Sequence, residues 1–428
     1  MLDDFSLSQG WGSADNPRII TGVNSDGTSD YVGFGDQYTL IAYGGTFSDG
    51  EGSTGAGFSD VTVAVKDFGT NEGYTADVQR GAAAAGVGDG DILYGQGYAG
   101  VYWYEATGET ATTDAAGNTY DVLQYQTSPN LYGNFGSQEG WTSDNGFQIL
   151  KTDSSDATAS ILGFGDAGIV VGPDAFASGA SAASSYVIPL AAGNNSGWKQ
   201  SVDVRSFTDQ SGKPIDLNGD GIADFVGMGP NGLVYAYGSE SGGTYGLGAL
   251  QTAHIEGGSS DLGEAQNWTD ATTPRSIVYD AKTGYDDIIA FGAAGVYVAM
   301  GQNPTTHNNE PFGQLYLAMA DFGSSQGWTV SDTPRLVGDV TGDGIPDIVG
   351  FGTNSTFVAV GSRDSSGNLV FKVDTTRTIA DFGSAEGWSG STEQAVRALG
   401  TVAGSGSTSS HADLILSGAS NTQVWHFT

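Results

Sequence analysis

Two short acidic loops carry the clearest chemistry in the sequence. Each places carboxylate, amide or hydroxyl oxygens at positions 1, 3, 5 and 9, and the glycine at position 6 permits the positive-φ turn that wraps an ion. Three carboxylates packed this closely repel one another unless a hard cation neutralises them, and the size and flexibility of the loop suit Ca²⁺ better than Mg²⁺. With a backbone carbonyl at position 7, the predicted ligands are Asp216, Asn218, Asp220, Ile222 and Asp224 in one loop and Asp339, Thr341, Asp343, Ile345 and Asp347 in the other.

Neither loop matches an EF-hand. Position 12 is Gly227 or Gly350 in place of Glu, and a strand pattern follows in place of a helix. A third loop, with Asn24, Asp26 and Asp30, lacks the leading Asp, so we expect a weak or empty site there. The alternative for all of these loops is an Asp/Asn turn without an ion. We predict two strong structural calcium sites that fasten adjacent strands by binding the folded state preferentially.

An aromatic residue recurs seven times, at spacings of 63, 67, 57, 70, 60 and 60 residues. These rings could stack on the apolar face of a sugar and are candidate carbohydrate-binding residues. The alternative, which the recurrence favours, is a packing residue that every copy needs. The seven residues are Trp11, Tyr74, Trp141, Trp198, Trp268, Trp328 and Trp388.

An arginine also recurs in six of the copies, although the chain has only 14 Lys and Arg residues. It could bind sugar hydroxyls or a carboxylate, but we favour a residue that forms hydrogen bonds between copies. The six are Arg18, Arg80, Arg205, Arg275, Arg335 and Arg397.

The aromatic residues mark seven copies of one repeat of about 60 residues, a period that indicates a propeller or solenoid. In the clearest copy, Asp321 to Gly361, short alternating runs rich in β-branched residues are separated by Gly and Asn turns, as in strands. Four strands per repeat make one propeller blade. We therefore predict an all-β fold, a seven-bladed β-propeller of four-stranded blades forming one domain over residues 1–428. The repeats start near residues 4, 67, 134, 194, 261, 321 and 381.

The two ends of the chain complement each other. The chain begins at the element that follows the outer strand in other copies, and it ends on a match to the third strand. We predict that Leu2 to Phe5 supplies the missing fourth strand, so that the N- and C-terminal strands share a blade and bury two sheet edges. The stretches from Tyr104 to Tyr132 and from Pro173 to Asn194 are predicted to be long surface loops.

Composition restricts the partners. The net charge of 14 − 49 = −35 repels nucleic acid and anionic membranes, and no apolar run is long enough to span a bilayer. The absence of Cys excludes disulfides and Cys-based zinc sites. The four histidines show no spacing typical of a metal site or a catalytic triad. They are His254, His307, His411 and His426.

The combination Phe-Gly-…-Gly-Trp, then Asp-x-Asn/Thr-x-Asp-Gly-x-x-Asp, resembles the FG-GAP (VCBS-type) repeats of integrin α-like propellers. The whole repeat resembles, more closely, the family of the fungal lectin of Psathyrella velutina. That resemblance implies calcium in some blades and shallow pockets between blades that bind N-acetylglucosamine or sialylated glycans. The lectin repeats usually have an Arg after the Gly-Trp, whereas the copies here read WGSADNPR, WTDATTPR and WTVSDTPR.

We therefore expect a calcium-stabilised, multivalent lectin that is a monomer, is extracellular although no signal peptide is visible, and is not an enzyme. The first alternative is a protein-binding, adhesive propeller without sugar binding. The second is a polysaccharide-degrading enzyme, because a glycosidase needs only two suitably spaced carboxylates. No pair among the 49 acidic residues stands out for that role.

Overall fold

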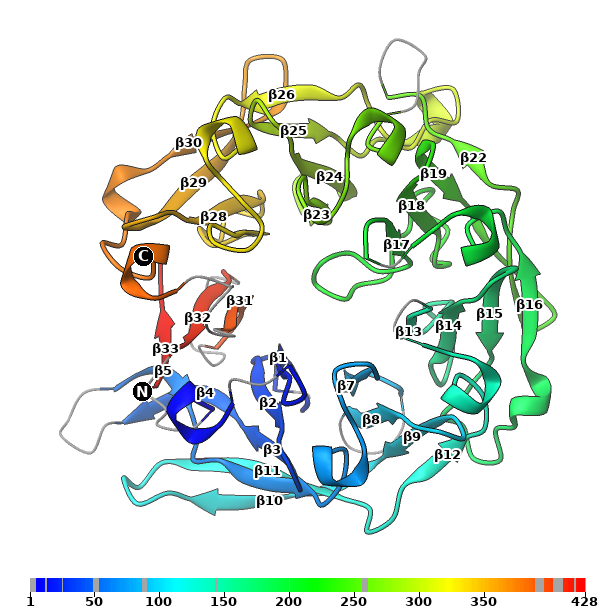
Figure 1. Cartoon of the computed structure of the whole chain (residues 1–428), viewed down its shortest axis with the longest axis vertical. Helices are drawn as coiled ribbons and strands as arrows, with labels where there is room; N and C mark the ends of the chain where they lie inside the picture. Colours follow the sequence, from blue (N-terminus) through cyan, green and yellow to red (C-terminus); the bar gives the residue numbers. More distant parts are fainter. Residues whose placement is uncertain are drawn as a thin grey trace.

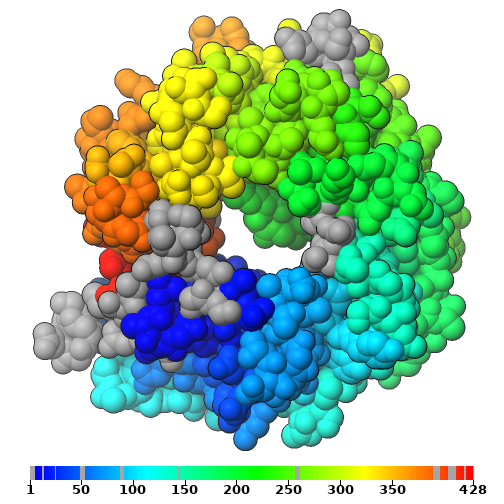
Figure 2. All heavy atoms as spheres, in the orientation of Figure 1, coloured from blue at the N-terminus to red at the C-terminus, as the bar shows by residue number. Residues whose placement is uncertain are grey.

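The computed structural model is a ring of antiparallel sheets (Figure 1) around a central channel that is open in the space-filling view (Figure 2). The described residues contain no α-helix, and none of their helical turns is long and apolar enough to cross a membrane. The prediction of an all-β, seven-bladed β-propeller is therefore confirmed. The structure describes residues 5–11, 14–24, 26–48, 54–86, 91–142, 145–199, 201–255, 261–388, 396–402, 411–418 and 421–427.

Each blade is a sheet whose first strand lies nearest the channel and whose later strands follow outward in chain order (Figure 1). Six blades have four strands, and the seventh has three within the described residues. The strands of the seven blades are β1 (Arg18–Thr21), β2 (Asp30–Phe34), β3 (Thr39–Ala42) and β6 (Thr62–Val65); β7 (Arg80–Ala83), β8 (Ile92–Gln96), β9 (Val101–Tyr104) and β12 (Asn130–Tyr132); β13 (Phe147–Leu150), β14 (Ser160–Phe164), β15 (Gly168–Gly172) and β16 (Tyr186–Pro189); β17 (Val204–Ser206), β18 (Phe225–Gly229), β19 (Gly232–Ala236) and β22 (Gln251–Thr252); β23 (Arg275–Asp280), β24 (Tyr285–Phe291), β25 (Val296–Ala299) and β26 (Tyr316–Met319); β27 (Arg335–Gly338), β28 (Asp347–Phe351), β29 (Thr356–Arg363) and β30 (Leu369–Val373); and β31 (Val396–Gly400), β32 (Asp413–Ser417) and β33 (Thr422–Trp425).

Additional elements lie between the main strands. Two-stranded ribbons follow the third strand in blades 1, 2 and 4, so the prediction of a surface loop over Tyr104 to Tyr132 was wrong: a Thr-rich run there pairs with a run of Thr, Tyr and Val residues as a hairpin. The ribbons are β4 (Gly44–Ser48) with β5 (Thr54–Phe58), β10 (Ala106–Thr113) with β11 (Thr119–Tyr125), and β20 (Gly238–Ser241) with β21 (Thr244–Leu247). The 3-10 turns are η1 (Leu7–Gln9), η2 (Thr70–Glu72), η3 (Ser137–Glu139), η4 (Ala182–Ser184), η5 (Asn194–Ser196), η6 (Glu264–Gln266), η7 (Pro304–Thr306), η8 (Ser324–Gln326), η9 (Thr375–Arg377) and η10 (Ser384–Glu386).

The ring closes between blade 7 and blade 1. The backbone N–H of Leu7 donates to the carbonyl of Gly418 at 3.1 Å, and that of Ser29 donates to Thr401. The fourth strand that we predicted from Leu2 to Phe5 lies outside the described residues except for Phe5, whose side chain is buried.

A buried phenylalanine with left-handed backbone opens most repeats. At Phe68, Phe322 and Phe382 φ lies between 62° and 64°, a costly conformation for a residue with a Cβ. The side chain of the preceding Asp accepts the phenylalanine N–H at 2.7 Å in each case, which holds the turn. The ring then packs on the repeat's aromatic residue, with centroids 4.4 Å apart for Phe322 and Trp328.

Recurring arginines contact the preceding blade, through the hydrogen bonds that we favoured from the sequence at Arg80 and Arg275 and through ring stacking at others. The guanidinium of Arg205 lies 4.9 Å from the ring centroid of Phe164 in the preceding blade, and Arg335 and Arg397 stack in the same way. Backbone bonds reinforce this contact: the N–H of Ala223 donates to the Thr152 carbonyl of blade 3 at 2.8 Å. Equivalent bonds run from Asp91 to Val23, Ala159 to Ala85, and Ala412 to Asp339.

A methyl group at Gly350 should destabilise its blade. A Cβ there would lie 2.0 Å from Cε1 of the buried Phe322 and 2.8 Å from Cη2 of the half-buried Trp328, whose rings pack on each other and cannot move aside easily. We expect Gly350→Ala to lower the free energy of unfolding by about 1–3 kcal/mol in urea titrations. Gly55→Ala, whose Cβ would meet nothing within 4 Å, is the control, and equal stability of the two variants would contradict this packing role.

Candidate functional site

The two acidic loops connect the first and second strands of blades 4 and 6. Their leading Asp residues turn back into the loop: Asp216 accepts the N–H of Gly221 at 2.9 Å, and Asp339 accepts that of Gly344 at 2.7 Å. Both glycines have positive φ, 84° and 83°, as the prediction for position 6 requires. The local turn geometry therefore follows the sequence pattern.

The Asp at position 9 has a further role that the sequence did not reveal. Asp224 is buried, and its two carboxylate oxygens accept the N–H groups of Leu217 at 2.7 Å and Gly238 at 2.6 Å. Asp347 accepts N–H groups from Val340 and Gly361 in the same way. Each carboxylate thus connects the loop that precedes the second strand to the chain in or just beyond the third strand.

A glycine must stand fourteen residues after this Asp. A Cβ at Gly361 would lie 2.1 Å from the carbonyl oxygen of Pro346, and one at Gly238 would lie 2.2 Å from that of Ala223. The same arrangement recurs in blade 1, where Asp30 accepts the N–H of Gly44 at 2.9 Å. The pattern Asp-x₁₃-Gly is a sequence signal that could have identified this contact.

Burial in these positions favours the neutral acid. Burial raises the pKa of Asp224 to about 7, of Asp347 to about 6 and of Asp30 to about 7, although the backbone N–H groups oppose the shift. A cation bound in the loop would favour the charged form instead. The donor set, rich in carboxylate oxygens, fits a hard cation such as Ca²⁺.

The structure does not gather the loop carboxylates tightly. Across the described ranges, the carboxylates of neither loop form a group of three whose ligand atoms all lie within 4.8 Å of one another. The side chains at positions 3 and 5 instead close local turns: Asn218 accepts the Asp220 N–H at 2.9 Å, and Asp343 accepts the Ile345 N–H at 2.9 Å. In the third loop, Asp26 accepts the Thr28 N–H at 2.8 Å. Calcium binding by these loops stays a prediction.

The recurring aromatic residues lie mainly in the core. Trp198, the least exposed of them, is 5% exposed, and Trp268 is 8% exposed; Trp328 and Trp388 are half-buried. Their rings cover the second-strand glycines of their own blades or pack on the buried phenylalanines. This placement accounts for their recurrence by packing and leaves little ring surface for a ligand, so sugar stacking on them stays untested.

Two hollows lie on the face of the ring at which the second strands of the blades end. One, of about 300 Å³, is in blade 1 and is lined by Trp11, Asn16, Asp36, Gln37 and Tyr38, among others. It combines an aromatic wall with carboxylate and amide groups, a composition that suits a small polar ligand. Sequence reasoning identified Trp11 alone, because the β2–β3 turn that supplies the other side has no motif.

The second hollow lies between blades 2 and 3 and has a volume of about 350 Å³. Its polar lining includes Asp77, Gln79, Thr142 and Gln148. Gln79 spans the two blades: its Nε2 donates to the carbonyl of Phe147 at 2.9 Å, and its Oε1 accepts the N–H of that residue at 2.9 Å. The polar wall is therefore held rigidly.

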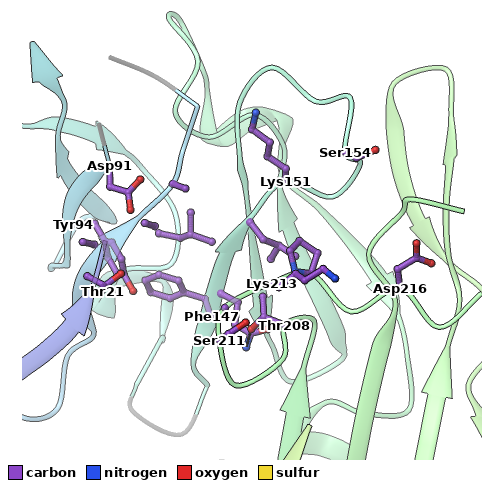
Figure 3. Close-up of a pocket in the computed structure, with 18 of the residues that line it drawn as sticks. Thr21, Asp91, Tyr94, Phe147, Lys151, Ser154, Thr208, Ser211, Lys213 and Asp216 are labelled. Carbon is purple, nitrogen blue, oxygen red and sulfur yellow. Dashed lines mark hydrogen bonds between the residues drawn. The ribbon is translucent and has the colours of Figure 1, made fainter. Parts of the chain in front are cut away.

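A larger hollow of about 730 Å³ is formed by residues of blades 1 to 4 (Figure 3). Lys151 and Lys213 line it together with Asp91 and Asp216, so both signs of charge meet there. Burial raises the pKa of Asp91 to about 7. The hollow adjoins the acidic loop of blade 4, since Asp216 belongs to both.

The spacing of the histidines gave no sign of a site, but the structure brings two of them together. His411 lies just before β32 and His426 just after β33, and both side chains point to Asp413. Their separation of fifteen residues has no meaning in sequence, because only the pairing of β32 with β33 brings them together.

The protein is therefore a seven-bladed β-propeller that has polar and aromatic hollows on one face of the ring. The chain matches no protein-family model and no curated protein, so the resemblance to FG-GAP repeats is not confirmed. Among solved structures, it is similar to a lectin of Agrocybe aegerita that specifically recognises non-reducing terminal N-acetylglucosamine. The TM-score is 0.69 and the identity 26%, over 90% of this chain and 86% of that one. The resemblance to a fungal lectin is thus confirmed.

In blade 5 the role of the buried carboxylate can be tested separately, because the loop before its second strand lacks the predicted calcium-ligand pattern. Asp287 is fully buried and accepts the Gly301 N–H at 2.7 Å, and burial raises its pKa to about 7. Because the folded-state pKa lies above the unfolded one, its contribution to stability is fully present below about pH 4 and is lost as the pH rises through about 7.

Asp287→Asn should remove the loss of stability that the natural chain shows as the pH rises, because Asn does not ionise. We expect the stability of the variant relative to the natural chain to increase by on the order of 2 kcal/mol between about pH 5 and about pH 8, measured by urea unfolding in chelator. Asp166→Asn, at an exposed turn, is the control and should leave the pH profile unchanged. Parallel profiles for Asp287→Asn and the natural chain would contradict the assignment.

Proposed function

We propose that this chain is a calcium-stabilised, multivalent carbohydrate-binding protein that acts as an extracellular monomer. The observation that carries the carbohydrate-binding part is the likeness, over 90% of the chain, to a lectin for terminal N-acetylglucosamine. The polar and aromatic hollows support it, because sugars are bound by apolar ring contacts together with a few directed hydrogen bonds. Extracellular Ca²⁺ levels suit loops of this type.

The blade 1 hollow is the proposed primary site. Its volume of about 300 Å³ suits one terminal sugar residue rather than a long chain. Asp36 is held in place there, since its Oδ1 accepts from Asn16 Nδ2 at 3.3 Å and from Thr70 Oγ1 at 2.9 Å. The half-buried ring of Tyr38 offers an apolar face beside these polar groups. Terminal N-acetylglucosamine is the first ligand to test.

The hollow between blades 2 and 3 is the proposed second site. It differs in chemistry, because carboxamide groups dominate its wall and no tryptophan lines it. Several weak sites on one rigid ring would bind a multivalent glycan far more tightly than any single site. The negative charge of the chain would steer it away from anionic polymers.

Glycan binding can be tested on an array of immobilised glycans with labelled full-length chain in calcium. We expect binding to glycans that end in N-acetylglucosamine, and Tyr38→Ala should reduce it on the order of tenfold because an aromatic contact is lost. Tyr98→Ala removes a ring that is 69% exposed and lies outside this hollow, so it should bind normally. An array without signal for folded protein would favour the adhesive alternative.

Calcium binding can be tested by thermal unfolding in calcium and in chelator. We expect Asp343→Ala to lower the melting temperature by several degrees in calcium but barely in chelator, because ion binding stabilises only the folded state. Asp166→Ala removes the same charge from an exposed turn and should behave like the natural chain. An equal loss for Asp343→Ala under both conditions would mean that the residue acts without an ion.

A further inference from the structure

Two histidines and an aspartate meet at one end of blade 7. His411 precedes β32 by two residues, Asp413 begins β32, and His426 directly follows β33. Asp413 Oδ1 lies 2.5 Å from Nδ1 of His426 and 3.5 Å from Nε2 of His411, and the two rings are nearly perpendicular with centroids 6.1 Å apart. Within the described ranges, this is the only group of three His, Asp or Glu side chains with all ligand atoms within 4.8 Å.

Comparison with the other blades shows that Asp413 occupies the recurring buried position. It is 1% exposed, and its Oδ2 accepts the N–H of Val402 at 2.8 Å, as Asp347 accepts that of Val340 in blade 6. The equivalent Oδ1 in blades 1, 4, 5 and 6 accepts the N–H of a glycine fourteen residues later. In blade 7 that position is Phe427, and Oδ1 faces the two imidazoles instead.

The donor set selects the class of metal. Two imidazole nitrogens and one carboxylate oxygen suit borderline divalent ions such as Zn²⁺, whereas Ca²⁺ prefers oxygen ligands alone. Neighbouring ligands of a tetrahedral zinc ion lie about 3.3 Å apart. The 3.5 Å separation of His411 from Asp413 matches that spacing, and the 2.5 Å separation of His426 has to open by less than about 1 Å.

His426 can make that adjustment. Its side chain is 31% exposed and follows the last strand of the sheet, whereas Asp413 is fixed by burial and by its backbone bond. We propose that His411, Asp413 and His426 form a binding site for a zinc-class divalent transition metal. Three protein ligands leave one position for water. The ion would fasten the third strand of blade 7 to the second, beside the closure of the ring.

A simple ion pair between protonated histidine and Asp413 is the competing explanation, and pH separates the two. Metal binding requires neutral imidazoles and is lost as the pH falls below about 6, whereas an imidazolium–carboxylate pair strengthens there. The metal site therefore predicts zinc-dependent stability at neutral pH. The ion pair predicts extra stability at acid pH that zinc does not change.

The experiment is a zinc titration of the full chain, followed by calorimetry near pH 7.5 in excess calcium, so that the acidic loops do not compete. We expect one tight zinc ion per chain, and the His411→Gln/His426→Gln variant should bind on the order of 100-fold more weakly. His254→Gln is the matched control: His254 pairs with Glu310 at 2.7 Å elsewhere, and this variant should bind like the natural chain. Equal melting temperatures in chelator establish that all variants are folded.

Measurements on the natural chain test the proposal independently of the variants. Co²⁺ should give the visible absorption of a four-coordinate site, and Zn²⁺ should raise the melting temperature near pH 7.5 but not near pH 5.5. Unchanged zinc binding in the double variant would overturn the proposal. So would the absence of any zinc effect near pH 7.5 together with added stability at acid pH.

Discussion

The structure depends on a carboxylate that is buried at the start of the second strand. A buried polar group must be hydrogen-bonded, and here the bonds reach two other segments of the same blade, the loop before the second strand and the chain around the end of the third. Asp30, Asp224 and Asp347 each accept one N–H from seven residues earlier and one from the glycine fourteen residues later. This one side chain therefore holds the loop before the second strand and the chain around the end of the third strand at fixed positions, and the close approach excludes any side chain larger than hydrogen at the glycine.

The buried Asp also has a fixed place in the register of its blade, and blades 2 and 3, which lack this Asp, pair in the same register. In each of blades 1, 4, 5, 6 and 7, the first-strand arginine pairs with the residue three places after the buried Asp, as Arg335 pairs with Gly350. The guanidinium then reaches the aromatic ring of the preceding blade, and Phe322 and Trp328 close over Gly350. Local hydrogen bonding, register and inter-blade stacking are thus parts of one repeated unit.

Blades in which the buried Asp or its partner glycine is replaced carry the polar hollow or the histidine cluster. Blade 2 has Ile92 and blade 3 has Ser160 at the position of the buried Asp, and the polar hollow that is lined by Gln79 and Gln148 lies between these two blades. Blade 7 keeps the Asp but exchanges the partner glycine for Phe427 and presents two imidazoles to it. Because a few positions of the repeat hold each blade together, the residues at the other positions can vary and form binding sites.

The sequence by itself determined the number of blades, the inner strands of each blade and the turns of the acidic loops, because these depend on local spacing and on alternation with period two, but it missed the ribbon of blade 2. It also predicted that the arginines join neighbouring copies. The recurrence of the tryptophans and Tyr74 favoured packing, but only the tertiary structure decided which glycines and phenylalanines they cover, that Tyr38 and Trp11 line one hollow, and that His411 and His426 meet at Asp413. Those arrangements depend on how separate turns and strand ends come together in space, and no fixed spacing along the chain encodes that proximity.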